Sequence, residues 1–539
     1  MKQDVIKVGM TFESDTTYVA TQDRYEFYPS DATDYDAKKI NISKRSDVLR
    51  FPVAFLISGK KNVTLDFGGA TLYLHGKMQP FVLENCENVT VKNVVVEFDR
   101  SGYSEMVVLE RGEGFFRAKM KDGFPYEIVD GNIEFVAPNW RTGGLNKVIH
   151  FLQEFDKDTR EGSGMYLVTI GKDCVLEDRP WKNQVYIMHV KQDGEDLVFY
   201  GDRVPPICVG NTLVYGHEER SCSSFATVDC KNVYIQNYRI LNGCGMGIQP
   251  IYTENIYIDG LQCFMDERSH GFVANLADVI HAVACFGDFV IENSIFQGMM
   301  DDALNVHSFF YRIGEVKDGE IVALNLTQSR ITNKVFDVGD EIKIFRGSTR
   351  DEVASCVITD LVIMEEENKL LLKVDGNLDG VQVDDVVENV STECHLVIRN
   401  CRFDKANTHL RFQTNTATVE NCHIALHCML TGDTVYWYES APVTRCVFKN
   451  CTFVGERGNI ATYPEVQATD TAPYYHGHLQ IENCTFECEQ PVHYRKSEKL
   501  TFKNNRNAFG KSMRIVMEES GETDVQDGVE VVRQQETGW

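Results

Sequence analysis

The stretch Leu396–Phe403, LVIRNCRF, alternates apolar and polar residues and then bends at an asparagine. Its form, apolar-x-apolar-x-Asn-x-x-Phe/Ile, is that of a strand with period two, a bend, and a second short strand. Eight other segments have this form or a close variant of it: VTVKNVVVEF (89–98), VYIQNYRIL (233–241), IYIDGLQCF (256–264), FVIENSIF (289–296), ATVENCHI (417–424), CVFKNCTF (446–453), LQIENCTF (479–486) and LTFKNNRN (500–507). Within each uninterrupted block, neighbouring copies are 21 to 33 residues apart, which is the spacing of stacked structural repeats.

Asparagine suits the bend of this repeat. It tolerates left-handed backbone geometry, and its side-chain amide can bond to the asparagine of the neighbouring repeat. A cysteine often follows, and we expect these thiols to fill small inward-facing positions: Cys401, Cys422, Cys451 and Cys484. A β-sandwich would not repeat one strand–Asn–strand unit in this way. The sequence therefore predicts an all-β protein built on a right-handed parallel β-helix.

The repeat is interrupted twice, by segments with alternating strand patterns. The two segments share a phrase, VGNTLVY (209–215) and VGDEIKIF (338–345), that reads as a glycine turn entering a strand. Such phrases are typical of small antiparallel β-barrels, so we expect two small β-barrel-like insertions. The predicted organisation is as follows: N-terminal turns of the β-helix (1–100), the first insertion (101–219), turns carrying the candidate catalytic residues (220–309), the second insertion (310–390), C-terminal turns (391–515) and a loosely docked acidic tail (516–539).

Composition and charge restrict the partners. The chain is 43% hydrophobic and 25% charged, as in folded globular proteins. Its formal net charge of −26 disfavours nucleic acid, an anionic membrane surface or a strongly acidic polysaccharide, because binding them needs clustered Lys and Arg. The chain also lacks an apolar run of about 18 residues, the length of a transmembrane helix. A neutral substrate fits best.

The N-terminal sequence and the cysteines bear on the compartment. The start, MKQDVIKVGM, has no apolar stretch of signal-peptide length, so we expect a cytoplasmic protein, or one from which an export signal has been removed. The 17 cysteines are odd in number and form no CxxC pair. This pattern favours buried thiols in a reducing compartment over a disulfide framework or a zinc site, and we expect no metal or other cofactor.

The candidate site begins with GMMDDALNVHS (298–308), which sets Asp301 and Asp302 side by side. Asp278 precedes Asp301 by 23 residues, about one turn of the β-helix, so it should lie beneath the pair at roughly 4.8 Å. Like charges so close raise at least one pKa, which suits a general acid working near neutral pH. One protonated and one ionised carboxyl group are what glycoside hydrolysis requires. A solvated pair of turn aspartates, or a calcium site, is the alternative.

His281, Asn305 and His307 flank the three aspartates in sequence. A lone histidine is usually a packing residue, but side chains so near an acidic cluster are candidates for binding sugar hydroxyls or orienting the carboxylates.

Two further segments offer candidate substrate-binding residues. DERSHG (266–271) brings Arg268 and His270 to the preceding loop, where a surface turn with an ion pair is the alternative. DTVYWYES (433–440) places Trp437 in an aromatic cluster that can stack on a sugar face, although packing explains such a cluster equally well.

With these motifs the chain resembles glycoside hydrolase family 110. The segments ADVIHAVAC (277–285) and MDDALNVH (300–307) are similar to the family's ADxxHxxxC and MDDAxNVHG patterns, and the resemblance covers most of the chain. It implies a right-handed β-helix interrupted by β-barrel insertions. It also implies an exo-acting α-1,3-galactosidase, of the kind that removes terminal galactose from the blood group B antigen, with an inverting mechanism.

The resemblance further implies roles for individual residues. Asp301 would be the general acid, with Asp278 and Asp302 activating water, while Asn305 and His307 would support or bind the sugar. The implied substrate is a neutral galactose-terminated oligosaccharide or glycan, with no nucleic acid and no membrane as partner. Because the flanks of large β-helices often pair, a homodimer is the candidate assembly.

The chain departs from the family in two features, Ser308 where the family has Gly and the missing leader, and both concern the substrate more than the chemistry. A polygalacturonase-type hydrolase also uses three aspartates, but HGH (476–478) and EIKIF (341–345) differ from its Gly-His-Gly and Arg-Ile-Lys motifs. A β-helix lyase would need calcium and a basic residue, and no Lys or Arg lies between Asp278 and His307. A non-catalytic carbohydrate-binding β-helix, such as an adhesin or tailspike, would not need three stacked carboxylates.

Overall fold

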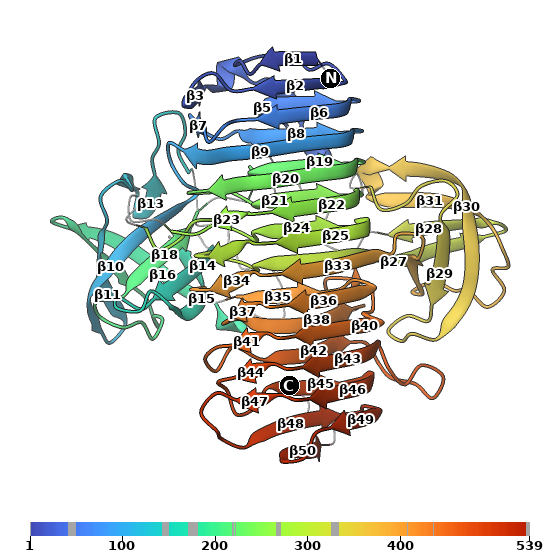
Figure 1. The fold of residues 1–539 in the computed structure, drawn as a ribbon. Helices are drawn as coiled ribbons and strands as arrows, with labels where there is room; N and C mark the ends of the chain where they lie inside the picture. The colour runs from blue at the N-terminus through green and yellow to red at the C-terminus, as the bar shows by residue number, and fades with distance from the viewer. Residues whose placement is uncertain are drawn as a thin grey trace.

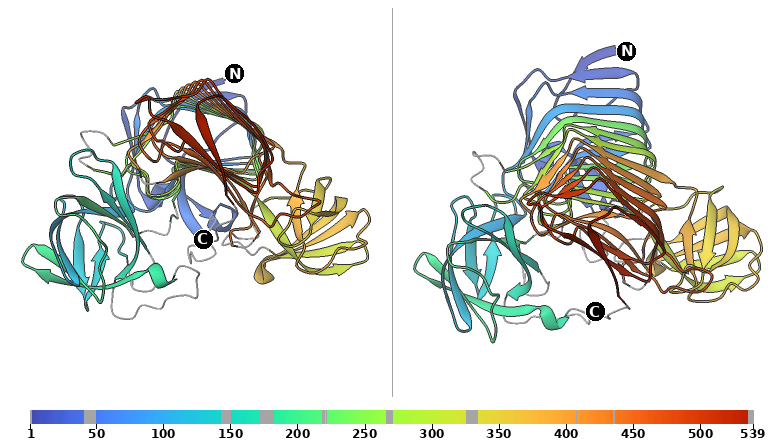
Figure 2. Two further views of the ribbon diagram at one scale, coloured as in Figure 1. Left: turned by 90° about the horizontal axis from the view of Figure 1, so that it is seen from below. Right: turned by 60° about the horizontal axis from the view of Figure 1, so that its bottom comes forward.

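The computed structural model describes residues 2–40, 50–142, 150–170, 182–217, 220, 222–265, 271–324, 334–406, 408–434 and 436–534. These residues form a right-handed parallel β-helix with two β-barrels on opposite flanks (Figures 1 and 2). The predicted fold class is confirmed. The described helices are short 3-10 turns, among them Pro29–Asp31, Ala37–Lys39 and Glu365–Glu367, and none is long and apolar enough to cross a membrane.

Three stacks of parallel strands form the β-helix. The first stack begins at the N-terminus and pairs strands in this order: β1 (Lys2–Val5), β2 (Thr16–Val19), β6 (Lys61–Asp66), β9 (Glu87–Phe98), β20 (Lys231–Ile240), β22 (Glu254–Asp259), β25 (Phe286–Glu292), β33 (Cys394–Arg399), β36 (Thr416–Glu420), β40 (Arg445–Lys449), β43 (His476–Glu482), β46 (Ser497–Lys503) and β49 (Glu522–Val525).

The second stack carries the candidate site. Its strands pair in this order: β5 (Arg50–Ser58), β8 (Gln79–Glu84), β19 (Phe225–Val228), β21 (Ile248–Ile251), β24 (Ile280–Val283), β27 (Leu304–Lys317), β35 (His409–Phe412), β38 (His427–Asp433), β42 (Ile460–Glu465), β45 (Val492–Arg495), β48 (Met513–Glu518) and β50 (Val529–Gln534). The third stack has short strands and follows the asparagine bends; among its strands are β26 (Ile295–Gln297), β34 (Arg402–Asp404) and β37 (His423–Ile424).

The asparagines adopt the left-handed backbone expected of them. The bend residues Asn93, Asn237 and Asn400 have φ of 56°, 48° and 54°. Side-chain amides donate to the asparagine oxygen one turn before, at 2.9 Å from Asn237 to Asn93 and at 3.3 Å from Asn400 to Asn293. In the variant copy IYIDG the bend residue is Gly260, with φ of 73°, and a Cβ there would lie 2.8 Å from Asn237 Oδ1. These ladders hold consecutive turns in one register.

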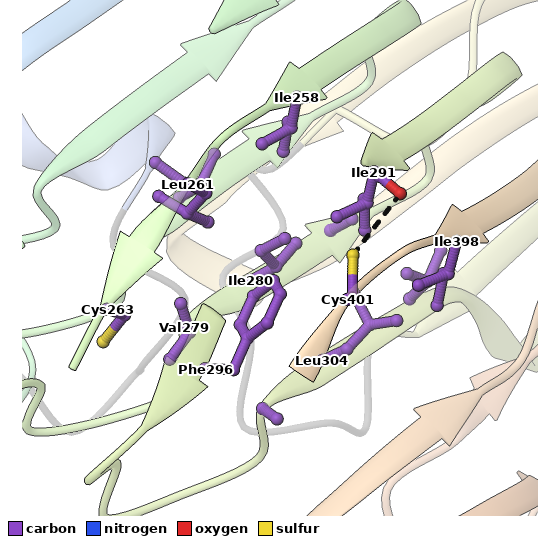
Figure 3. Close-up of a cluster of buried hydrophobic side chains, with 14 of the residues drawn as sticks. Ile258, Leu261, Cys263, Val279, Ile280, Ile291, Phe296, Leu304, Ile398 and Cys401 are labelled. Atoms are coloured by element: carbon purple, nitrogen blue, oxygen red, sulfur yellow. Dashed lines mark hydrogen bonds between the residues drawn. The ribbon is translucent and has the colours of Figure 1, made fainter. Parts of the chain in front are cut away.

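Inward-facing side chains stack at equivalent positions of successive turns. Ile258, Ile291 and Ile398 are partners in the strand register and are at most 1% exposed (Figure 3). The cysteine after the bend packs inward as expected: Cys401 is 3% exposed and donates to the Ile291 carbonyl at 3.7 Å. The core is therefore a set of columns parallel to the axis of the β-helix.

Two closed barrels interrupt the β-helix. The first contains β10 (Tyr103–Gly112), β11 (Phe115–Met120), β14 (His150–Phe155), β15 (Gly162–Ile170), β16 (Tyr186–Asp193), β17 (Asp196–Tyr200) and β18 (Thr212–Gly216). The second closes through the outer half of β27 with β28 (Glu320–Leu324), β29 (Glu341–Phe345), β30 (Glu352–Met364), β31 (Lys369–Asp375) and β32 (Val386–Asn389).

The acidic C-terminal segment differs from the loosely docked tail that its charge predicted. From residue 516 to Gln534 the chain continues the β-helix, because β49 pairs in parallel with β46 and β50 pairs with β48. Glu519, Glu522, Asp524, Asp527 and Glu530 are exposed, and Asp524 forms an ion pair with Lys503 of the preceding turn. Backbone pairing with an exposed strand edge therefore outweighs the charge of the segment.

Removal of one core side chain should show how much the columns contribute. We expect Ile398→Ala to lower the free energy of unfolding by about 2–5 kcal/mol, because it leaves a cavity between Ile291 and Val419 of the neighbouring turns. Val397→Ala, on the outer face of the same strand, is the matched control and should cost less than about 1 kcal/mol. Urea denaturation followed by fluorescence measures both changes. Equal losses in the two variants would contradict the assignment of the two faces.

Candidate active site

Strands β24, β27 and β35 build the site on the outer face of the second stack. Ile280, Leu304 and Leu410 point into the core, so the residue after each of them points outward. The register pairs His281 with Asn305 and Asn305 with Arg411. The first barrel contacts the chain just before β27, where Gln153 donates to the Met300 carbonyl at 2.6 Å. The C-terminal half of β27 belongs to the second barrel.

The three predicted aspartates lie together at the start of β24 and β27. The Val279 amide donates to the Asp302 carbonyl at 3.0 Å, and the strand register sets Asp278 opposite Asp302 on the next turn. Asp278 is 2% and Asp302 5% exposed, whereas the side chain of Asp301 is 32% exposed. The structure thus joins two buried carboxyl groups to a third that reaches solvent.

Asp278 begins a buried chain of hydrogen bonds. Its Oδ2 contacts His281 Nδ1, and His281 Nε2 lies 3.1 Å from His307 Nε2. His307 Nδ1 in turn lies 2.9 Å from the carbonyl oxygen of Ser308. Burial, together with the charge of Asp301, raises the pKa of Asp278 well above its ordinary value. Burial lowers the pKa of each imidazole to about 4.

Asp302 has a different environment from Asp278. His409 Nδ1 lies 3.2 Å from its Oδ1, and Arg411 Nη1 lies 3.9 Å from its Oδ2. Burial raises the pKa of Asp302 to about 6, although the hydrogen bond from His409 opposes that rise. Asp302 can therefore gain or lose a proton near neutral pH.

The carboxylates of Asp301 and Asp302 have different partners, which keeps the two like charges apart. Asp301 Oδ2 forms an ion pair with Arg220 Nη2, and Asp301 Oδ1 accepts from the Asp302 amide at 3.0 Å. Asp301 is thus held at the rim by one cation and one backbone donor.

Glu439 organises the other wall of the site. It belongs to the short strand β39 (Glu439–Ser440), which pairs with β27. Its Oε2 lies 3.2 Å from Arg411 Nη2 and accepts from Gln413 Nε2 at 2.7 Å. Burial of Glu439 disfavours its charged form, but Arg411 and the other donors outweigh that and lower its pKa to about 2. The same Gln413 amide lies 3.4 Å from Asn305 Oδ1, which fixes that predicted side chain in the wall.

Five residues of the site were missed by the sequence reasoning: Arg220, His409, Arg411, Gln413 and Glu439. For His409, Arg411 and Gln413, the spacing of the repeats contains a signal. Phe296 and Phe403 close equivalent repeats and are stacked at 4.6 Å. His409 follows Phe403 by six residues, as Asp302 follows Phe296. Counting across the second insertion would thus have placed HLRFQ, residues 409–413, next to the aspartates.

The remaining sequence-predicted residues have other positions. Arg268 and His270 lie outside the described residues. Trp437 lies between β38 and β39, is 37% exposed and packs edge-on against Tyr436, and no contact within the described part of the chain joins it to the three aspartates. Ser308 stands where the family pattern has Gly. Its carbonyl oxygen accepts from His307 Nδ1 and so ends the buried chain of hydrogen bonds. Across the described ranges, no group of three or more His, Cys, Asp and Glu side chains could hold a metal ion.

Comparison with curated proteins gives relatives over nearly the whole chain. Alpha-1,3-galactosidase A of Shewanella woodyi is 26% identical over 508 residues, which are 91% of this chain and 80% of that protein. Alpha-1,3-galactosidase A of Bacteroides fragilis is 27% identical over 509 residues, 89% of this chain and 80% of that protein. The chain is similar to alpha-1,3-galactosidases.

Three further comparisons give weaker or no similarity. Alpha-1,3-galactosidase B of Akkermansia muciniphila is 25% identical over 505 residues, which are 89% of this chain and 60% of that protein. No family model matches the chain. Among solved structures, the tailspike protein gp49 of Pseudomonas phage LKA1 matches with a TM-score of 0.29 and 8% identity, covering 90% of this chain and 67% of that one.

The buried pair of Glu439 and Arg411 should be costly to break. We expect Glu439→Ala to lower the free energy of unfolding by about 3–5 kcal/mol, since it leaves the guanidinium of Arg411 with only the more distant carboxyl of Asp302. Glu420→Ala, which removes a partly exposed ion pair with Arg399 at 3.5 Å, is the control and should cost less than about 1 kcal/mol. Urea denaturation measures both, and a Glu439→Ala loss as small as the control's would contradict the assigned pairing.

Proposed function

We propose that the protein is a glycoside hydrolase that removes terminal α-linked galactose, most specifically α-1,3-linked galactose, by an inverting mechanism. The observation that carries the proposal is the register that sets two buried carboxyl groups, Asp278 and Asp302, on neighbouring turns, and burial raises the pKa of both. The similarity to proteins named alpha-1,3-galactosidase supports the sugar and the linkage.

A count of hydrogen-bond donors supports an acidic proton at Asp278. A carbonyl oxygen only accepts, so His307 Nδ1 carries a proton toward Ser308. One more proton is needed between the two Nε2 atoms, and a third between His281 Nδ1 and Asp278 Oδ2. Two neutral imidazoles supply only two of these three protons. The trio Asp278–His281–His307 therefore holds one additional proton and has no net charge.

The additional proton belongs on Asp278. Burial lowers the pKa of both histidines to about 4 and raises that of Asp278, so the neutral rings and the protonated carboxyl are the favoured state. Asp278 would then protonate the glycosidic oxygen of the departing group, and solvent would restore the proton after each turnover. This division differs from the one that the family resemblance implied, in which Asp301 is the acid.

Asp302 is the candidate base and Asp301 its support. His409 and Arg411 stabilise the ionised form of Asp302, which can accept a proton from an attacking water. Asp301, paired with Arg220 at the rim, would orient that water or a sugar hydroxyl. Among the described residues, the two arginines at the aspartates, Arg411 and Arg220, are each already paired with a carboxylate, which fits a neutral galactoside.

Substitution of the two buried carboxyls tests the reaction. With galactosyl-α-1,3-galactose as substrate, we expect Asp278→Asn and Asp302→Asn each to reduce kcat by at least about 100-fold, because each removes one proton transfer. Asp288→Asn, at an exposed position of β25, is the matched control and should retain wild-type activity. Near-ultraviolet circular dichroism checks the fold. A protein that binds galactose but releases none even as wild type would instead be a carbohydrate-binding β-helix.

The stereochemistry of release tests inversion. Proton NMR during the first minutes of hydrolysis should show β-galactose before mutarotation, since water attacks the face opposite the leaving group. Initial α-galactose would contradict inversion and indicate a covalent intermediate, while leaving the hydrolase assignment intact.

The pH dependence follows from the environment of Asp302. The base works only when ionised, so kcat/KM should fall tenfold per pH unit below about pH 6, where burial places its pKa. His409→Ala removes the hydrogen bond that opposes this rise, so the acidic limb should move to higher pH. A limb near pH 4 in the wild type, or a limb that does not move in the variant, would contradict the assignment of Asp302.

A further inference from the structure

We propose a second carbohydrate subsite beside Asp302, formed by His409, His427 and Arg457, which binds the sugar unit to which the terminal galactose is attached. The inference rests on the proposed function, because it names the part of that substrate which leaves. It concerns the turns of the second stack that follow the three aspartates toward the C-terminus, through β35, β38 and β42 (Figure 1).

Two imidazoles lead away from the candidate base. His409 and His427 are register partners on β35 and β38, and their rings are stacked with centroids 6.0 Å apart and planes 27° from parallel. His409 Nδ1 donates to Asp302, and its side chain is 36% exposed. Its other ring nitrogen, Nε2, has no hydrogen-bond partner within the described residues, and it lies beside the position where the glycosidic bond would be cleaved.

The tautomer of His427 is fixed by its neighbour Asn459. The Asn459 amide nitrogen donates to the Glu456 carbonyl at 3.2 Å, which turns its Oδ1 toward His427 Nδ1. His427 Nδ1 must then carry the proton, and Nε2 is left as an acceptor. Burial, helped by the charge of Arg457, lowers the pKa of His427 below its ordinary value. The ring is thus neutral at pH 7, and its acceptor fits a hydroxyl donor.

Arg457 supplies the complementary donors. It lies on the turn before β42, two residues from Asn459, and its side chain is partly buried. Within the described ranges its guanidinium has neither an ion-pair nor a hydrogen-bond partner. Burial lowers its pKa from the ordinary value, and the charge of Glu161 in the first barrel opposes that lowering. A partly desolvated guanidinium without a partner favours a ligand that brings acceptor oxygens.

Together these groups match a sugar ring. Two imidazole rings on neighbouring turns, with centroids 6.0 Å apart, and a planar set of N–H donors fit the hydroxyl groups of a sugar, which both donate and accept. The ring of His427, whose pKa burial lowers, suits an uncharged sugar. Glu161, whose pKa burial raises, borders the same region from the first barrel and would disfavour an anionic substituent.

The test compares two galactosides that differ only in the leaving group. α-Galactosyl-(1→3)-lactose places a sugar in the subsite, and 4-nitrophenyl α-galactoside does not. We expect His427→Ala and Arg457→Ala each to raise KM for the trisaccharide about tenfold, with kcat/KM for the nitrophenyl substrate within about twofold of wild type. His395→Ala and Arg445→Ala, at exposed positions of the first stack, are matched controls for both substrates.

Binding of lactose, the departing product, is measured in parallel by saturation-transfer NMR. We expect both subsite variants to weaken lactose binding, with the controls unchanged. Equal losses on both substrates, or no change on either, would overturn the subsite. If the wild type hydrolyses neither galactoside, the proposed function fails, and lactose binding decides the subsite by itself: binding that the two variants weaken supports it, and absent or unaffected binding overturns it.

Discussion

The backbone register between successive turns is the constraint on which the rest of the structure depends. Hydrogen bonds such as that from the Val279 amide to the Asp302 carbonyl, at 3.0 Å, fix which residue of one turn lies above which residue of the next. The same register stacks isoleucines inside and polar side chains outside. Residues separated by an insertion of about eighty positions thus meet at the strand spacing, as Asn305 and Arg411 do. The stacking thus brings together the part of the site that runs from Asp278 to Arg411.

Burying so many ionisable groups is stable because each charge has a partner. Arg220 pairs with Asp301 at the rim, and Arg411 pairs with Glu439 in the wall. Asp278 avoids an unpaired buried charge by sharing a proton with its histidine chain. The three buried carboxyl groups therefore have different roles. Glu439 stays ionised and holds Arg411, while Asp278 and Asp302, whose pKa values are raised, can exchange protons.

The repeat LVIRNCRF was enough to predict the β-helix, because an asparagine bend after a period-two strand has few other uses. It also placed Asp278 one turn from the Asp301–Asp302 pair, since the distance along the chain matched one repeat. The sequence did not reveal Glu439 or Arg220. Glu439 joins the site through a two-residue antiparallel strand against β27, a pairing that no repeat signals. Arg220 follows the first insertion, where the repeat count is lost. The acidic charge of the C-terminal segment was misleading, because an open strand edge determines whether a segment pairs.

The protonation of the histidine chain tests the central claim most directly. Long-range ¹H–¹⁵N NMR of histidine-labelled, deuterated protein at pH 7, with signals assigned through His281 and His307 single variants, reports the tautomer of each ring. Both rings should be neutral, with the proton of His307 on Nδ1 and that of His281 on Nε2. The bare Nδ1 of His281 would then require the proton on Asp278. A His281 ring protonated on Nδ1 would place an ionised carboxylate at Asp278 and contradict its assignment as the acid.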